Sequence, residues 1–277
     1  MTDFTALRTT DLTFSYTATD DLDEGQRWST YWDVERSCRG PEPRPDWVVS
    51  DRAAVDTELG VLKTGKEADV HLVRRAVPGT DGVLLAAKRY RSEEHRTFHR
   101  STAYTQGRRT RSTRDTRALA KGTRHGRAVA SGQWAAAEWD ALVRFWSAGV
   151  AVPYPVQIDG TELLMELVTH GGAPAPRLAS TRPEPALLAS YFDQLREVLG
   201  ALARAGLAHG DLSPYNVLAA GERLVVIDLP QVVDIVANPA GADFLQRDCH
   251  NVCAWFRRRG LDVDEDALFG ETIAQAW

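Results

Sequence analysis

The chain has 277 residues, of which 43% are hydrophobic and 26% charged, and its formal net charge is −5. This composition is typical of a folded globular protein and excludes a fibrous or fully disordered chain. No apolar run approaches the ~20 residues that a membrane span needs, and the N-terminal residues lack the basic-then-apolar order of a signal peptide. We therefore expect a cytoplasmic protein without a membrane partner.

The three cysteines, Cys38, Cys249 and Cys253, predict free thiols, because an odd number without framework spacing does not suit a disulfide framework. Cys249, His250 and Cys253 are close enough in sequence for a zinc site, but no second ligand pair appears elsewhere. The three- and four-residue spacing of apolar side chains from Cys249 to Phe256 instead predicts one face of a helix.

Residues 1–48 are polar, with acidic patches and a proline-rich stretch at 41–45. Prolines disfavour continued helix or strand, so an extended connector is expected. We predict an N-terminal extension that is partly flexible and loosely docked, with a domain boundary near residue 48. A further hypothesis, based only on charge complementarity, is that this extension docks on the basic stretch 89–127 and closes the functional cleft.

From residue 59 the pattern changes to strand, turn and strand. The run GVLKTGKEADVHLVRRA alternates apolar and polar residues, PGTDG is turn sequence, and VLLAAKRYR resumes an apolar run. The stretch 89–127 then holds Arg or Lys at twelve positions against three acids. It is typical of a flexible basic loop, which we favour, although a contact surface for RNA or a ribosomal particle is the alternative.

The remaining elements are mainly helical. Apolar spacing of three and four predicts a helix between Gly132 and Gly149. The run VPYPVQIDGTELLMELV predicts a turn and an apolar strand, and GGAPAP is a linker-like break. A helix at about 185–205 should end at Gly206, which is a helix C-terminal signal. A strand at 224–233 and a final helix around 241–259 are expected after it.

The segment 209–216, HGDLSPYN, and the later Asp228 carry the chemistry. Phosphoryl transfer from ATP needs a carboxylate near the attacking hydroxyl, ligands for Mg²⁺, and a cation on the phosphates. Asp211 would supply the first, and Asn216 with Asp228 the second. Lys88 would supply the cation. The HxDxxxxN spacing places its Asp and Asn on one loop, and Asp228 approaches from a neighbouring strand end.

Seven blocks of sequence, in the same order and with compatible gaps, resemble the RIO family of atypical kinases, nearer the bacterial-type members of its first subfamily. The blocks are LKTGKEADVHL, LLAAKRY, WAAAEWDALVRFWSAGVAVPYPV, LLMELV, HGDLSPYNVL, VVIDLPQVVD and ADFLQRDCHNV, within about residues 55–256. The resemblance implies a minimal two-lobed, protein-kinase-like α+β fold at 49–277. A small β-rich N-lobe would span about 49–165 and a helical C-lobe about 169–277.

The resemblance also implies roles for single residues. Asp211 is the catalytic base, with Lys88 and Asp228 as further catalytic residues, and Asn216 with Asp228 binds the metal. The residues implied to bind ATP are Lys63, Gly65, Lys66, Glu67, Ala68, Val70, Ala86, Lys88, Glu138, Met165, Glu166 and Val168. Lys63 and Ala68 replace two of the three glycines of the ordinary kinase phosphate loop. We expect His209 to be a structural hydrogen-bonding residue and Asp248 to fix the terminal helix.

The implied function is that of an ATP- and Mg²⁺- (or Mn²⁺-) dependent serine/threonine protein kinase, acting on protein hydroxyls including its own, or of an ATPase switch. In the second case Asp228 is a nucleophile by analogy with the family. Two alternatives stay open. One is a small-molecule phosphotransferase of the aminoglycoside type, and the other is a nucleotide-gated ribosome-assembly or RNA-binding factor that uses residues 89–127. The sequence does not specify the protein substrate.

Overall fold

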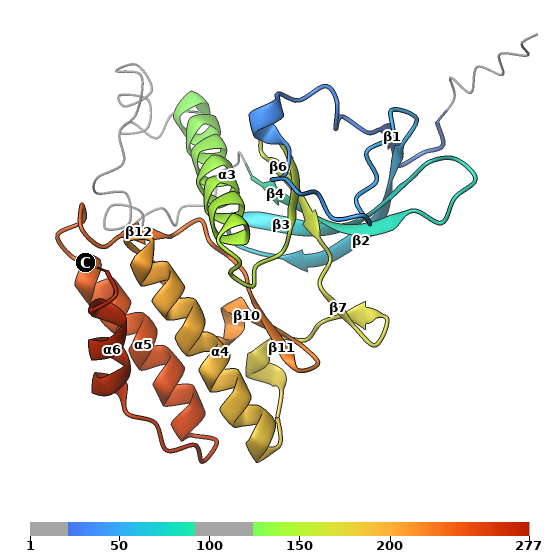
Figure 1. The fold of residues 1–277 in the computed structure, drawn as a ribbon. Helices are drawn as coiled ribbons and strands as arrows, with labels where there is room; N and C mark the ends of the chain where they lie inside the picture. The colour runs from blue at the N-terminus through green and yellow to red at the C-terminus, as the bar shows by residue number, and fades with distance from the viewer. Residues whose placement is uncertain (1–21, 92–123, 277) are drawn as a thin grey trace, which may run out of the picture.

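The computed structural model describes residues 22–91 and 124–276, with side chains from residue 131 in the second range, and arranges them in two lobes (Figure 1). The first lobe is built on a six-stranded antiparallel sheet in the order β1-β2-β3-β4-β6-β5. Its strands are β1 (Gln26–Trp28), β2 (Val55–Thr64), β3 (Ala68–Ala76), β4 (Val83–Tyr90), β5 (Pro155–Asp159) and β6 (Glu162–Glu166). Helix α3 (Arg124–Ser147) packs against β4, β5 and β6.

The second lobe is mainly helical. Its helices α4 (Pro185–Arg204), α5 (Gly241–Arg257) and α6 (Glu265–Ile273) lie side by side (Figure 1). Three small two-stranded sheets join β7 (Thr169–His170) to β8 (Ala173–Pro174), β9 (Leu207–Ala208) to β12 (Val233–Asp234), and β10 (Val217–Ala220) to β11 (Arg223–Val226). Short 3-10 turns are η1 (Arg36–Cys38), η3 (Leu178–Ser180) and η4 (Pro214–Asn216). The fold is the two-lobed, kinase-like α+β architecture expected from the sequence.

Alternation along β4 decides which side chains reach which side of the sheet. Successive residues of a strand point to opposite faces. Leu85 and Ala87 therefore pack behind the sheet, in a buried cluster with Tyr31, Val48 and Val73. Ala86 and Lys88 face the front, where they line a cavity between the lobes.

Residues 22–48 cover the back of the sheet. Strand β1 pairs with β2, and the Gly40 N–H donates to the Val156 carbonyl at 3.0 Å. The Tyr154 hydroxyl donates to the Pro41 carbonyl at 3.0 Å. This segment is integral to the sheet rather than loosely docked, and none of its residues lines the front cavity. The hypothesis that the extension closes the cleft is therefore wrong for residues 22–48; residues 1–21 lie outside the described residues, and the boundary near residue 48 stays a prediction.

Several predicted elements differ in extent. The region 59–90 holds two strands and part of a third instead of two, because the chain turns at 65–67 as well as at 77–82. The predicted strand 224–233 is broken, with β11 ending at Val226 and β12 beginning at Val233. Asp228 between them has a left-handed backbone, with φ of 67°, which interrupts extended structure. Helix α6, with Asp264 as its N-cap, was not predicted.

The basic stretch predicted as a loop at 89–127 overlaps regular structure at both ends. Strand β4 continues to Tyr90, and α3 begins at Arg124. The loop expectation is corrected at these two ends, because β4 pairs with β3 and β6 as far as residues 89–90 and α3 begins before the apolar spacing that predicted it. Residues 92–123, which hold most of the stretch, lie outside the described residues.

The cysteine cluster on α5 is part of the core. Cys249 and Cys253 are fully buried and all three thiols are free. Burial raises the pKa of Cys249 to about 12 and that of Cys253 to about 11, so both thiols stay protonated. His250 instead contacts Glu265 at 2.9 Å. Within residues 22–91 and 124–276, no group of three or more His, Cys, Asp or Glu is arranged to hold a metal.

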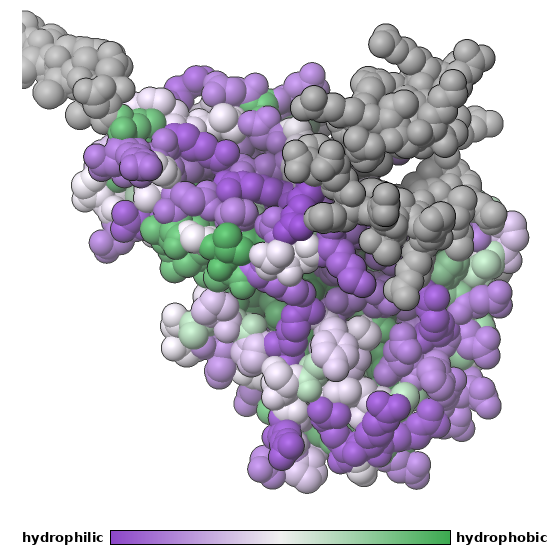
Figure 2. All heavy atoms as spheres, turned by 180° about the vertical axis from the view of Figure 1, so that it is seen from behind, coloured by the Kyte–Doolittle hydropathy of each residue, from purple (hydrophilic) through white to green (hydrophobic). Residues whose placement is uncertain are grey.

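Seen from behind, the surface of the described residues is mostly hydrophilic, with a hydrophobic area at mid-height (Figure 2). Exposed apolar side chains on the sheet include Leu59, Val61 and Leu62 of β2 and Leu84 of β4. Leu62 also lines the front cavity. No helix in the described part of the chain is long and apolar enough to span a membrane.

Candidate active site

A cavity of about 670 Å³ lies between the two lobes. Its volume falls within the ~300–1,000 Å³ that small-molecule sites occupy. All twelve residues that the sequence predicted to bind ATP line it, together with Asp211 and Asp228. They come from β2, β3, the turn between these strands, β4, α3, the link between the lobes and the C-lobe loops, so the fold brings together segments spread over 166 positions, from Lys63 to Asp228.

Lys88 is the centre of the charged part of the cavity. Its Nζ donates to Glu138 Oε1 at 2.6 Å and to Asp228 Oδ1 at 2.7 Å. Burial alone would lower the pKa of Lys88, but the two carboxylates raise it above its ordinary range. The ammonium group is therefore charged at all physiological pH values. Strand β4, helix α3 and the C-lobe are joined at this one nitrogen.

The two carboxylates that bind Lys88 differ in access. The Glu138 side chain is 2% exposed, whereas the Asp228 side chain is 44% exposed. Burial favours a raised pKa for Asp228, but the charge of Lys88 outweighs it and lowers the pKa. Asp228 is also the only non-glycine residue with positive φ in the described ranges. Such backbone strain is concentrated at functional sites.

The loop that carries Asp211 is held by helix α5. Asp248 is fully buried and accepts the N–H of Gly210 through Oδ2 and the N–H of Leu212 through Oδ1, both at 2.8 Å. Asn251 Nδ2 donates to the Leu212 carbonyl at 3.0 Å. Asp248 was expected to fix the terminal helix, and its two oxygens do join that helix to the loop of Asp211, which they hold at the same time. Burial raises the pKa of Asp248, against the opposing effect of the hydrogen bonds from the Gly210 and Leu212 N–H groups.

His209 is fully buried and bonds to backbone, as expected for a structural residue. Its Nδ1 accepts the Asp211 N–H at 3.4 Å, so Nε2 is the nitrogen that donates to the Ile227 carbonyl at 3.2 Å. The ring thereby connects the Asp211 loop to the segment that precedes Asp228. The same imidazole therefore contacts the backbone of both segments that carry the site carboxylates.

Asp211 and Asn216 are placed differently. The Asp211 side chain is exposed and lines the cavity. Asn216 is 8% exposed, does not line the cavity, and donates from Nδ2 to the Asp211 carbonyl at 2.9 Å. Of the predicted site residues, Asn216 alone is not among the lining residues.

The turn between β2 and β3 covers the charged end of the cavity. The Gly65 N–H donates to the Ala68 carbonyl at 3.0 Å. A Cβ at Gly65 would lie 2.7 Å from that oxygen, so the turn needs glycine here. Burial, and next the charge of Asp228, raise the pKa of Glu67, whereas burial and then Arg177 lower that of Lys63. The charges of the site therefore act on both side chains, that of Asp228 on Glu67 and that of Arg177 on Lys63.

Five basic and five acidic residues line the cavity, an arrangement that suits a polyanion bound together with a cation. The basic residues are Lys63, Lys66, Lys88, Arg91 and Arg177, and the acidic residues are Glu67, Glu138, Glu166, Asp211 and Asp228. The end nearer the link between the lobes is apolar, with Pro153, Leu167, Pro174, Ala175 and Leu218 beside Met165 and Val168.

Sequence reasoning missed Tyr90, Arg177 and Asp248 as site residues. Tyr90 lines the cavity and its hydroxyl donates to Glu138 Oε2. Its position two residues after Lys88 in a predicted strand was an available signal, because such side chains share a face. Nothing local marked Arg177, which enters from the C-lobe, or the contacts of Asp248.

Comparisons with known proteins agree on one family. The family model described as the RIO domain matches residues 76–268. A RIO-type serine/threonine-protein kinase Rio1 of Haloferax volcanii is 38% identical over 215 residues, covering 78% of this chain and 68% of that protein. The protein of the same name from Thermoplasma acidophilum is 30% identical over 135 residues, which are 49% of this chain and 69% of that protein.

A solved structure shows the same fold. The Rio2 kinase of Chaetomium thermophilum, in a complex with ADP, Mg²⁺ and phosphoaspartate, matches with a TM-score of 0.55 and 21% sequence identity. The match covers 79% of this chain and 62% of that chain. At this identity the likeness concerns the fold.

Proposed function

This chain belongs to the RIO domain family, and from that premise we propose that it acts as a RIO-type serine/threonine-protein kinase, transferring the γ-phosphoryl group of ATP to protein hydroxyls, including its own. The curated relatives reported above carry that activity in their names. The small-molecule phosphotransferase alternative is not favoured by them.

One observation carries the proposal: a single lysine joins a buried carboxylate of α3 to an accessible carboxylate of the C-lobe inside a nucleotide-sized cavity. Kinases of this general design use such a lysine on the nucleotide phosphates and such an aspartate on the metal. Lys88 would hold the phosphates, and Glu138 would fix Lys88. The apolar end of the cavity, with Met165 and Val168, would receive the adenine.

Asp211 is the proposed catalytic base. Its carboxylate lines the cavity on a loop that Asp248 and His209 hold through backbone hydrogen bonds. It would accept the proton of the substrate hydroxyl as that oxygen attacks the γ-phosphorus and ADP leaves. The position of the carboxylate depends on a rigid loop rather than on an ion pair of its own.

The donor set fits a divalent cation, for which we propose Mg²⁺ or Mn²⁺. Carboxylate and amide oxygens are ligands that Mg²⁺ prefers, and it is commonly held by one or two protein ligands plus substrate phosphates. Asp228 offers a carboxylate that is 44% exposed, and Asn216 would add its amide oxygen, since the amide nitrogen is engaged with Asp211. When bound, the cation would neutralise charge developing on the phosphates.

ATP hydrolysis is the second candidate activity, and the geometry of Asp228 favours it. A strained, accessible carboxylate beside the phosphates can itself attack the γ-phosphorus, forming an acyl phosphate and releasing ADP. Water would then hydrolyse the acyl phosphate to aspartate and inorganic phosphate. The Rio2 structure named above is a phosphoaspartate complex.

Turnover of labelled ATP distinguishes these activities. Wild type, Asp211→Ala and Asp228→Ala are compared for released phosphate and for label on protein, with Asp193→Ala, an exposed change on α4, as control. Acid-stable, hydroxylamine-insensitive label that both site variants lose is the expected kinase result. Hydroxylamine-labile label lost in Asp228→Ala would establish the acyl phosphate. Wild type without label or released phosphate would overturn both activities.

Contact with RNA or a ribosomal particle through residues 89–127 stays a proposal, supported only by the basic composition of that stretch. RNA binding that weakens steeply with salt and survives Asp211→Ala would support it. Equal RNA affinity at low and high salt would contradict it.

A further inference from the structure

The carboxylate of Glu138 is almost completely buried, and each of its oxygens has its own partner. Oε1 accepts from Lys88 Nζ at 2.6 Å, and Oε2 accepts from the Tyr90 hydroxyl. A buried carboxylate oxygen without a donor is costly, because it loses its hydration and gains no hydrogen bond in return. The hydroxyl therefore fixes the half of the carboxylate that Lys88 does not hold.

Strand geometry explains why Tyr90 reaches the same carboxylate as Lys88. Residues two apart on β4 point to the same face, ~6.6–6.8 Å apart along the strand. The Tyr90 ring is 5% exposed, and Lys88 Nζ lies 5.3 Å from its centroid, within the range of a cation–π contact. One tyrosine thus contacts both members of the ion pair.

The hydroxyl is a permanent donor. Burial, and next the charge of Glu138, raise the pKa of Tyr90 well above its ordinary value. The phenol therefore keeps its proton throughout the physiological range. The donor side of its contact with Glu138 is therefore the same throughout that range.

The contact between Tyr90 and Glu138 matters because two carboxylates share Lys88. Lys88 binds two carboxylates, of which Asp228 is accessible and Glu138 is not. When Asp228 serves a cation or becomes phosphorylated, as the proposed function requires, Lys88 is left with Glu138 alone. The orientation of Glu138 then decides where the ammonium group points.

We propose that Tyr90 is a positioning residue for phosphoryl transfer: it holds the Glu138 carboxylate so that Lys88 stays directed at the nucleotide phosphates after Asp228 has left it. The inference rests on the proposed function. Strand β4 then carries both the cation, Lys88, and the group that orients its partner Glu138, the Tyr90 hydroxyl.

The first test replaces Tyr90 by Phe, which removes one hydroxyl and keeps the ring. Tyr191→Phe is the matched control, because Tyr191 is also buried and its hydroxyl donates to the Gly221 carbonyl in the C-lobe. Loss of a hydrogen bond to a charged group is expected to lower kcat/KM for ATP about tenfold in Y90F. Y191F should stay within about twofold of wild type.

A double-mutant cycle with Glu138→Ala separates positioning from general stability. If Tyr90 acts through Glu138, adding Y90F to E138A changes kcat/KM less than about twofold, although each single change lowers it. An equal tenfold loss in both backgrounds would overturn the proposal. A Y90F protein that unfolds but folds again when combined with E138A would also support the contact, whereas unfolding in both backgrounds would make Tyr90 purely structural and overturn it.

Failure of the inference is distinguishable from failure of the proposed function. ATP binding and turnover in wild type, with Y90F matching Y191F, would overturn the role of Tyr90 and leave the kinase proposal intact. Wild type that neither binds nor turns over ATP, measured by calorimetry and phosphate release, would overturn the kinase proposal and remove the premise of the inference.

Discussion

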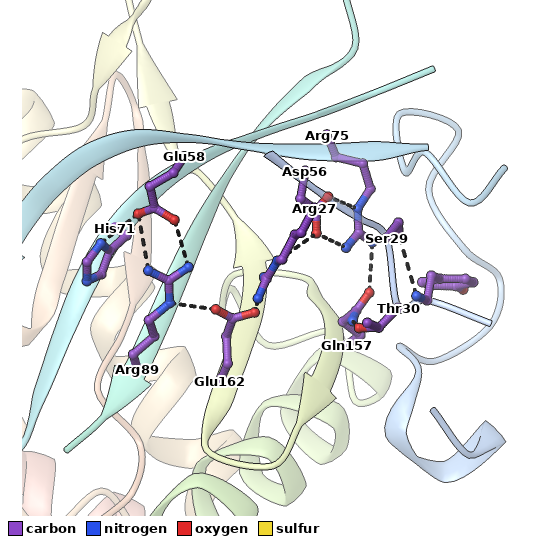
Figure 3. Close-up of polar contacts among 11 residues, drawn as sticks. Arg27, Ser29, Thr30, Asp56, Glu58, His71, Arg75, Arg89, Gln157 and Glu162 are labelled. Carbon is purple, nitrogen blue, oxygen red and sulfur yellow. Dashed lines mark hydrogen bonds and ion pairs between the residues drawn. The ribbon is translucent and has the colours of Figure 1, made fainter. Parts of the chain in front are cut away.

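Two basic side chains on neighbouring strands of one sheet, Arg75 on β3 and Lys88 on β4, both bind carboxylates but on opposite faces. Arg75 is fully buried and donates to both oxygens of Asp56, at 2.6 and 2.8 Å, and to Gln157 Oε1 at 2.8 Å (Figure 3). Lys88 shares one ammonium group between two carboxylates, one of them 44% exposed. The planar guanidinium is satisfied by fixed partners, while the lysine can exchange them.

The charged side chains on the back face of the sheet, from Arg75 to His71, form a back-face network. Its carboxylates become more exposed to solvent with distance from Arg75. Asp56 is 2% exposed, Glu162 is 12% exposed between Arg27 and Arg89, and Glu58 is 31% exposed between Arg89 and His71 (Figure 3). The closed end joins Thr30, through Gln157, to the sheet. The comparison teaches that a fully buried ion pair makes the lobe sensitive to loss of either partner, whereas one with an accessible partner is available for chemistry.

Arg75→Met should give the largest effect, on stability. It leaves the buried Asp56 with only the partly exposed Arg27, at 3.7 Å, as a cationic partner, and loss of one member of a buried pair costs about 3–5 kcal/mol. Urea unfolding followed by circular dichroism measures the loss. The double variant Arg75→Met/Asp56→Leu should recover most of it, because both charges are then gone. A double variant as unstable as the single one would contradict the fixed-pair interpretation.

Lys88→Met should act on turnover more than on stability. Removal of one preorganised charge from a transition state typically lowers kcat by about 10²–10³-fold. The stability loss should be smaller than for Arg75→Met, because Asp228 is accessible to water and Glu138 keeps Tyr90. Phosphate release and urea unfolding on the same preparations test both halves, and equal destabilisation by the two variants would remove the distinction between the faces.

Asp248→Asn tests how α5 holds the loop that carries Asp211, the proposed catalytic base. An amide has one oxygen, so Gly210 or Leu212 loses its acceptor, at a cost of about 1–3 kcal/mol. We expect kcat to fall about tenfold with ATP affinity nearly unchanged, since Asp248 does not line the cavity. Asp264→Asn is the control for loss of the charge alone: Asp264 accepts two backbone N–H groups at the N-cap of α6 through one oxygen, Oδ1, which the amide keeps. A control variant with the same loss of kcat would contradict the assignment.

Glu58→Gln at the open end of the back-face network should give the smallest effect. Burial would raise the pKa of Glu58, but Arg89, followed by His71, outweighs it and lowers the pKa. The carboxylate therefore stabilises the fold above its unfolded pKa of ~4.3, and this contribution is lost as pH falls through the lower folded value. Since the pair is partly exposed, the variant should lose about 0.2–1 kcal/mol at pH 7. The difference between wild type and variant should shrink below about pH 4 in urea unfolding, and a constant difference down to pH 3 would contradict it.

Local sequence predicted much of the fold. Helices α4 and α5 follow from the three- and four-residue apolar spacing, and β6 from the turn and apolar run that predicted one strand there, whereas β5 before the turn was not predicted. The broken strand after Val226 was missed, because an apolar run does not reveal the positive φ of Asp228. The integral position of residues 22–48 was also missed, since proline-rich polar sequence resembles a linker until Tyr31 and Val48 are seen buried.

The sequence by itself determined the chemical inventory: a lysine on an apolar strand, a loop with Asp and Asn at fixed spacing, and an aspartate after a strand. Only the tertiary structure decided which groups meet. Lys88 and Asp228 are 140 positions apart, and Asp248 meets Gly210 across 38. Periodicity specifies the face on which a side chain emerges, but its hydrogen-bond partner depends on which other segment packs there. That is why the partners of Tyr90 and Asp248, and the closed pair at Arg75, emerged only from the fold.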